Sequence, residues 1–252
     1  MSAEEVERGR FLARENRFVA RVERADGHVV RAYVPNTARL EDLLVENATV
    51  VLRPATAPNR ATGWTLTRVW QGTWVALDAN AATGLVADHL ERGAPLPGWE
   101  PPVGVRREAV RGPHRFDLAI DLADGREAIV EVKSLTSVHG GVAGLSSTPS
   151  ARGVRHLEAL AVLAARGTPT TVVFVVQRGD ITSLDLTATA ALSWVDAVER
   201  ARQAGVHVVA FGCEVGASRL RLGPALPVHP DHPPVRPPRA RAQATSTTTT
   251  AR

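Results

Sequence analysis

The segment that most constrains the fold is TTVVFVVQ, residues 170–177, in which apolar side chains follow one another without alternation. A strand that is apolar on both faces is typical of the interior of a sheet covered by helices. Helical patterns at about 149–166 and 188–204 flank this segment, and another apolar segment, VHVVAFGCEV, covers residues 206–215. From Val105 onward the chain is therefore predicted to form an α/β domain, with a mixed sheet and helices on both faces.

The N-terminal part has a different pattern, with short alternating segments separated by turn signals such as Asp26-Gly27 and Gln71-Gly72. Five strands and one short helix in ARLEDLLV, residues 38–45, predict a small closed barrel, although periodicity alone does not separate an OB-like barrel from other barrels. We place this domain at residues 1–80 and the sheet domain at 81–228, after a helix and a proline-rich connector. Residues 229–252, rich in Pro, Arg and Thr, are predicted to be a disordered tail.

The composition excludes several classes of protein. No apolar stretch approaches the ~20 residues that cross a bilayer, and the charged N-terminus does not resemble a signal peptide, so we expect a cytoplasmic protein. A single cysteine, Cys213, excludes an internal disulfide and is expected to be buried. Much of the formal net charge of +4 lies in the tail, so any nucleic-acid surface must be a local basic patch.

Lys133 is the single lysine among 30 basic residues, and it lies inside the apolar strand AIVEVKSL. Together with Asp117 and Glu131 it forms an Asp-x13-Glu-x-Lys pattern across two adjacent strands. The two-residue period of a strand places Glu131 and Lys133 on one face. Two alternatives remain open: a catalytic metal site for Mg2+ or Mn2+ at Asp117 and Glu131, or solvated carboxylates neutralised by Lys133.

The turn between the two strands decides whether Asp117 joins that face. A three-residue loop, Ala123-Asp124-Gly125, would place Asp117 opposite Glu131, with Gly125 in the left-handed conformation. A two-residue Asp-Gly loop would place Asp117 opposite Val132, on the wrong face, because a slip of one residue inverts every side chain. The metal-site hypothesis therefore requires the three-residue loop.

Two groups of basic residues are candidates for contact with nucleic acid. The first precedes Asp117 on the same strands and brackets Glu108, and the second begins the helix that follows an expected Thr148 N-cap and Pro149. A helix start with basic side chains suits a phosphate group, although surface arginines and a packed histidine are about as plausible. The candidates are Arg106, Arg107, Arg111, Arg115, Arg152, Arg155 and His156.

These segments resemble the SfsA family, the sugar fermentation stimulation proteins, over nearly the whole chain up to Phe211. The resemblance is carried by FVARVERADGHVVRAYVPNTARLEDLL, HRFDLAIDL, VEVKSLT, RGVRHLEAL and VVFVVQRGD. It implies an OB-like domain followed by a restriction-endonuclease-like domain of the PD-(D/E)XK type, with DNA binding of little sequence preference. It also assigns Asp117, Glu131 and Lys133 to the nuclease-like site, with Glu108 as an accessory carboxylate.

The chain departs from the family pattern just before Arg152. The family carries an Asp and a Glu there, where this chain has Ser147 and Ala151. Two functions are therefore expected as alternatives: a metal-dependent nuclease acting on DNA or RNA, or a non-catalytic nucleic-acid-binding regulator of sugar utilisation. A sugar-metabolising enzyme finds no support, because we see no phosphate loop, dinucleotide glycine motif or convincing nucleophile triad.

Overall fold

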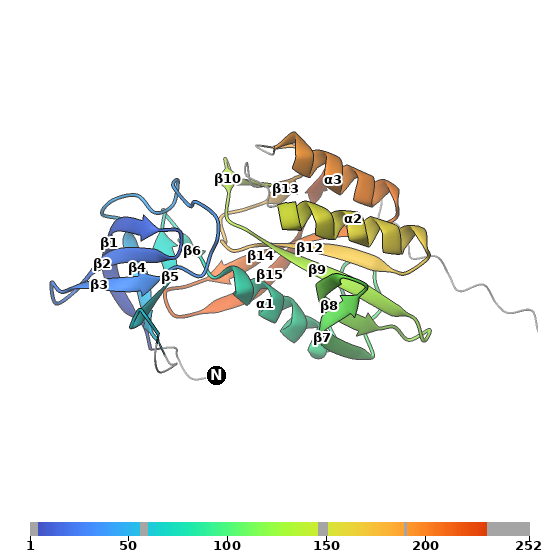
Figure 1. Ribbon diagram of the computed structural model, residues 1–252, viewed down its shortest axis with the longest axis horizontal. Helices are drawn as coiled ribbons and strands as arrows, with labels where there is room; N and C mark the ends of the chain where they lie inside the picture. The colour runs from blue at the N-terminus through green and yellow to red at the C-terminus, as the bar shows by residue number, and fades with distance from the viewer. Residues whose placement is uncertain (1–4, 56–59, 146–150, 189–190, 231–252) are drawn as a thin grey trace, which may run out of the picture.

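The computed structural model describes residues 5–55, 60–145, 151–188 and 191–230. A β-barrel lies at one end of a helix-covered sheet (Figure 1). The barrel strands occur in the order β3-β2-β1-β4-β5-β6, and a parallel pairing of β3 with β5 closes it. Their bounds are β1 Glu7–Asn16, β2 Val19–Arg24, β3 Val29–Tyr33, β4 Thr49–Pro54, β5 Trp64–Trp70 and β6 Trp74–Ala76.

The barrel confirms the OB-like prediction but corrects two of its details. Strand β1 was not predicted, because its charged residues hide an alternation in which only Phe11 is fully buried. Residues 38–45 form turns rather than the predicted helix. Leu40 adopts a left-handed φ of 57°, and its carbonyl accepts from the N–H groups of Leu43 and Leu44. All three leucines are buried in the barrel core, so burial decides the local conformation there.

The second domain is built on six strands in the order β15-β14-β12-β9-β8-β7. Helices α2 and α3 cover one face and α1 covers the other, as predicted (Figure 1). The elements are α1 Ala79–Glu91, β7 Gly104–Arg111, β8 His114–Asp121, β9 Glu127–Leu135, α2 Ala151–Ala165, β12 Thr170–Val176, α3 Leu192–Gln203, β14 His207–Val215 and β15 Leu220–Leu226.

Strand β12 shows why the sheet lies in the interior. All seven of its residues are buried. Val172, Phe174 and Val176 pack into the cluster under α2 and α3, while Val173 and Val175 pack into the cluster under α1. On both sides the strand has parallel neighbours, β9 and β14. An unbroken apolar run is therefore required by two cores, one on each face.

A small four-stranded sheet adds to the predicted elements. Its strands, in the order β10-β11-β13-β16, are Val138–His139, Val142–Gly144, Ser183–Asp185 and Val228–His229. His229, the first residue assigned to the tail, thus pairs with Asp185 instead of being disordered. The rest of the predicted tail, residues 231–252, lies outside the described residues. Among the helices described, none is long and apolar enough to span a membrane.

The barrel is attached to the sheet domain at the end of β12. The N–H of Ala76 donates to the carbonyl of Gln177 at 2.9 Å, and the Gln177 amide donates to the carbonyl of Asp78 at 2.7 Å. Val75 also forms a bridge with Arg178. These contacts join β6 to the residues that directly follow β12, and β12 neighbours β9, the strand that carries Glu131 and Lys133.

Candidate functional site

The register of β8 and β9 confirms the three-residue loop. Leu118 pairs with Val130, and the Leu122 N–H donates to the carbonyl of Arg126 at 2.8 Å across the loop. The assigned pairing ends at Leu118, and the same register continued by one step would place Asp117 opposite Glu131. Gly125 has a φ of 80°, the left-handed conformation that the loop requires.

Gly125→Ala should lower the free energy of unfolding by about 1 kcal/mol, because an L side chain is strained at this φ. A Cβ at this position would meet nothing within 4 Å, so backbone strain is the single cause expected. Urea unfolding measures the change, and Gly125→Asn should lose less because asparagine tolerates the left-handed region better. Equal stability of Gly125→Ala and the wild type would contradict the assigned loop.

Glu131 is the buried centre of the site, with 3% of its surface exposed. One carboxylate oxygen, Oε1, accepts from the Lys133 ammonium and from Nδ1 of His156, the latter at 2.6 Å. The other oxygen, Oε2, is buried and finds no hydrogen-bond partner within the described part of the chain. Two donors therefore hold one oxygen and leave the second available to another ligand.

Asp117 approaches the same region from β8. Its Oδ2 accepts from the backbone N–H of Val132 at 2.8 Å, which ties the carboxylate to β9. The β8–β9 pairing assigned by backbone register ends at Leu118, immediately before this side-chain bond. Beyond Leu118, the Val132 N–H therefore donates to the Asp117 side chain instead of to a backbone carbonyl of β8.

Electrostatics differ between the two carboxyl groups. Burial raises the pKa of Asp117 above its ordinary value, and the nearby negative charge of Glu131 raises it further. Burial also opposes ionisation of Glu131, but the hydrogen bond from His156 and the charge of Lys133 outweigh it and hold that pKa below its ordinary value. A cation between the two carboxylates would relieve the repulsion that Asp117 experiences.

Glu108, the predicted accessory carboxylate, has a left-handed φ of 61° in the middle of β7. Its neighbours in the ladder, Arg107↔Leu118 and Ala109↔Phe116, place it opposite Asp117. The pair Arg107↔Leu118 faces α1, whereas the next pair, Ala109↔Phe116, packs under α2. Residues two apart in a strand normally share a face, so the β7–β8 hairpin changes face at Glu108 and Asp117. The Glu108 side chain is exposed and lies 3.6 Å from the Arg115 guanidinium, and no described contact joins it to Glu131.

The predicted basic run does not form one free patch. Arg107 lies near Asp88 and Glu91 of α1, whereas Arg106 binds Asp121 on the other face of the ribbon. Arg111 pairs with Glu127, which Arg106 also contacts. Contact of these arginines with nucleic acid stays a prediction. To bind a phosphate, each arginine would have to leave its carboxylate partner or contact both groups at once.

The remaining candidates for contact with nucleic acid lie at the start of α2 and differ in exposure. Arg152 and Arg155 are exposed and make no ion pair with any described residue. His156 is 8% exposed and binds Glu131, so the structure places it behind the carboxylate rather than on a phosphate-binding surface. The expected cap at Thr148 and Pro149, and the substituted Ser147, lie outside the described residues.

The contact of His156 with Glu131 is the functional feature that the sequence analysis missed. Helical periodicity could have placed His156 on the buried face, because Gly153, Leu157 and Leu160 are buried on the same side of α2. Its ring also packs against Phe116, with ring centroids 5.6 Å apart. The pattern along the helix indicates burial but does not indicate which strand residue the imidazole meets.

The donor set suits a hard divalent cation in part. Asp117 and Glu131 lie on neighbouring strands, close enough for the charge of Glu131 to raise the pKa of Asp117, and the unpartnered Oε2 of Glu131 is the kind of oxygen that Mg2+ or Mn2+ binds. The described residues contain no group of three or more His, Cys, Asp or Glu side chains placed to hold a metal. Asp117 and Glu131 would therefore have to share the cation with water or with a bound phosphate.

Comparison with known proteins bears on both domains. The model described as the SfsA N-terminal OB domain matches residues 12–77, and the one described as the sugar fermentation stimulation protein RE domain matches residues 81–219. These matches agree with the barrel and with the helix-covered sheet that follows it.

Relatives match over most of the chain. A sugar fermentation stimulation protein homolog from Acetivibrio thermocellus is 34% identical over 220 residues, covering 86% of this chain and 93% of the relative. One from Chloroflexus aurantiacus is 36% identical over 222 residues, covering 86% and 83%. The structure of Pyrococcus furiosus SfsA in complex with Ca2+ aligns with a TM-score of 0.80 at 25% identity, covering 90% of this chain and 97% of that one. Since both domains match in the same order as in these relatives, the chain belongs to the SfsA family.

Proposed function

We propose that this protein binds nucleic acid and hydrolyses its phosphodiester bonds with the help of Mg2+ or Mn2+. The observation that carries the proposal is Glu131, a buried carboxylate with one oxygen held by two donors and the other unpartnered. The β8–β9 register continued one step past Leu118 would place Asp117 opposite it, and Lys133 lies on the same face of β9. This combination supports metal-assisted phosphoryl chemistry better than it supports a purely structural ion pair.

Each residue has a distinct part in that chemistry. Asp117 and Glu131 would hold the cation, which when bound stabilises charge on the phosphate and lowers the pKa of a water molecule. His156, a positioning residue on α2, keeps the Glu131 carboxylate oriented through its hydrogen bond to Oε1. The Lys133 ammonium, 19% exposed, can stabilise negative charge that develops on the phosphate. The structure of the Pyrococcus furiosus protein is a complex with Ca2+, a hard cation that prefers oxygen ligands, and this supports a role for a divalent cation.

Binding should depend mainly on phosphate contacts, so affinity for unrelated DNA sequences is expected to fall steeply with salt. Arg152→Ala together with Arg155→Ala should lower the slope of log K against log salt by about one for each phosphate that is no longer neutralised. Fluorescence anisotropy with EDTA present measures the slope. Arg166→Ala, an exposed arginine just beyond the other end of α2, is the matched control. A salt-independent affinity would contradict phosphate binding.

A second candidate is a non-catalytic nucleic-acid-binding regulator. One observation favours it: Ala151 is the first residue of α2 and supplies no carboxylate where the family pattern has an acid. Purified protein incubated with single- and double-stranded DNA and RNA, with Mg2+, Mn2+ or EDTA, separates the two candidates. Cleavage that requires the metal supports the nuclease. Binding without cleavage under every condition supports the regulator.

A further inference from the structure

Surface aromatic residues occur in the barrel and not in the described part of the sheet domain. Every aromatic side chain of Phe, Trp or Tyr in the sheet domain is buried: Trp99, Phe116, Phe174, Trp194 and Phe211. In the barrel only Phe11 is buried. Phe18 and Trp70 are 43% and 45% exposed, and Tyr33, Trp64 and Trp74 are partly exposed. Trp64 packs against the barrel core, but core packing does not account for the other four side chains.

Trp70 and Trp74 form a pair at the end of the β5–β6 hairpin. They are direct cross-strand partners, with ring centroids 5.2 Å apart and planes inclined by 69°. Their neighbours Val69 and Val75 are buried in the barrel core, so the alternation of the strands points both tryptophans outward. Gln71 anchors the hairpin, because its amide donates to the carbonyl of Leu43 at 2.7 Å. The pair is therefore held in place before any ligand arrives.

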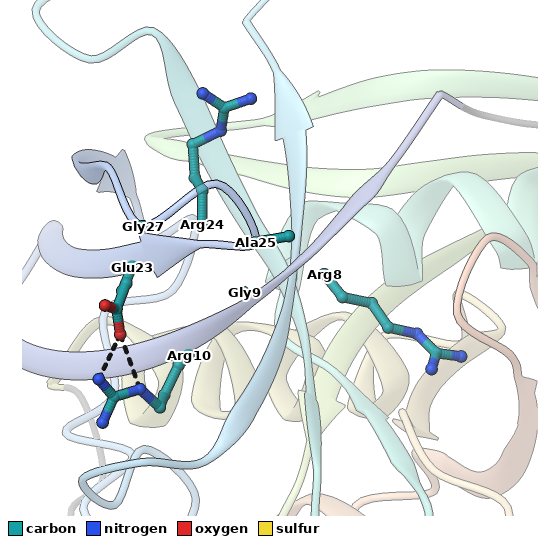
Figure 2. Close-up of a pocket in the computed structure, with 7 residues that line it drawn as sticks. All are labelled: Arg8, Gly9, Arg10, Glu23, Arg24, Ala25 and Gly27. Atoms are coloured by element: carbon teal, nitrogen blue, oxygen red, sulfur yellow. Dashed lines mark hydrogen bonds and ion pairs between the residues drawn. The ribbon is translucent and has the colours of Figure 1, made fainter.

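Arg8 adds a positive charge to this pair. Its guanidinium carbon lies 5.7 Å from the centroid of the Trp74 ring. Figure 2 shows the Arg8 side chain pointing away from Arg10 and Arg24, which line the same hollow, and Arg10 turned toward Glu23. Arg10 and Arg24 are held in ion pairs, whereas Arg8 has none with the described residues. A cation beside a partly exposed ring matches a nucleotide, which presents a phosphate beside a base.

A second group with the same composition lies at the other end of β5. Tyr33, paired with Thr65, stacks on Phe18 with centroids 6.5 Å apart, and the Arg60 guanidinium lies 4.8 Å from the Tyr33 ring. From Thr65 to Trp70 the strand covers roughly 17 Å. That length corresponds to a few nucleotides, which falls within the usual site size of an OB domain.

We propose that the barrel binds single-stranded nucleic acid by stacking unpaired bases on its surface aromatics, with Trp70 as the first stacking contact and Arg8 beside a phosphate. This inference rests on the proposed nucleic-acid function and specifies its substrate. In a duplex each base face is covered by the next base pair, so the exposed rings could meet only the backbone and the base edges in the grooves. In a single strand the base faces are open to aromatic side chains.

The test uses the full chain in EDTA and three labelled probes of about 20 nucleotides, a length above one OB site: oligo-dT, an abasic strand with the same number of phosphates, and a duplex. Wild type should bind oligo-dT about tenfold more tightly than the abasic strand, and Trp70→Ala should remove that preference. Trp70→Phe should keep most of it. Leu192→Ala, which truncates an 80% exposed side chain in the sheet domain, should change nothing.

Three results would overturn the inference. The first is equal affinity of wild type for oligo-dT and the abasic strand, and the second is an undiminished preference in Trp70→Ala. The third is an oligomeric state that changes in Trp70→Ala, which would show that the tryptophan pair is a contact between copies of the chain. Binding of all three probes without discrimination refutes stacking but leaves the proposed function standing. Absence of binding and of metal-dependent cleavage refutes both.

Discussion

Glu131→Gln should reduce metal-dependent cleavage about a hundredfold to a thousandfold while leaving nucleic-acid affinity within about twofold, the expected scale for losing one preorganised charge. The substitution keeps the shape of the side chain and removes the charge that binds a cation. It also leaves Lys133 and His156 without their shared anionic acceptor. Arg152 and Arg155, which are proposed to carry binding, are not altered.

Asp117→Asn should have a comparable effect, and the same strand offers a matched control. Asp121, also in β8, is an exposed carboxylate that pairs with Arg106, away from Glu131. Asp121→Asn makes the same chemical change without touching the site, so its cleavage rate should remain near that of wild type. Single-turnover cleavage of a labelled oligonucleotide compares the three variants.

Thermal unfolding gives a second readout that does not depend on activity. A cation that binds only the folded state stabilises it by about 2.7 kcal/mol at a concentration of 100 Kd. Mn2+ should therefore raise the Tm of wild type and of Asp121→Asn, but not that of Glu131→Gln or Asp117→Asn. An equal rise in all four proteins would place the cation elsewhere, and full cleavage by Glu131→Gln would refute the site.

The shared face of Glu131 and Lys133 could be predicted because it depends on a local rule. Strand alternation places Glu131 and Lys133 on one face. Gly125 suits both the two-residue and the three-residue loop, so the hairpin register in the structure is what decides between them. Likewise, the apolar run in β12 predicts an inner strand because both of its faces lie in a core. In each case the predictive pattern lies within one strand, although the two cores that bury β12 are formed by segments distant in the sequence.

Other features depend on contacts that no local pattern encodes. His156 meets Glu131 across 25 positions, and periodicity along α2 indicates only that the residue is buried. Arg106 and Arg107 are adjacent in sequence but bind carboxylates on opposite faces of β7. Strand β1 was missed because its charged side chains suggest a solvated segment, whereas its backbone joins β2 and β4 within the barrel. Contacts between segments distant in the sequence determine all of these features.

Lys133→Arg should abolish cleavage nearly as completely as Glu131→Gln, although it preserves the charge. The Lys133 ammonium contacts one oxygen of Glu131 and leaves Oε2 unpartnered among the described residues. An arginine fork tends to bind both oxygens of a carboxylate, so it would occupy the oxygen proposed for the cation. Its larger head must also fit where the lysine side chain is only 19% exposed, beside the buried ring of His156.

Lys133→Met separates charge from shape, since it keeps an unbranched side chain and removes the ammonium. It should lose cleavage but retain the Mn2+-dependent rise in Tm, because Oε2 of Glu131 stays available. Lys133→Arg should lose both cleavage and that rise. Circular dichroism and binding to oligo-dT in EDTA serve as controls for folding. If Lys133→Arg cleaves at the wild-type rate, cleavage does not require the small ammonium group of a lysine at this position. The case for a nuclease would then rest on the two carboxylates alone.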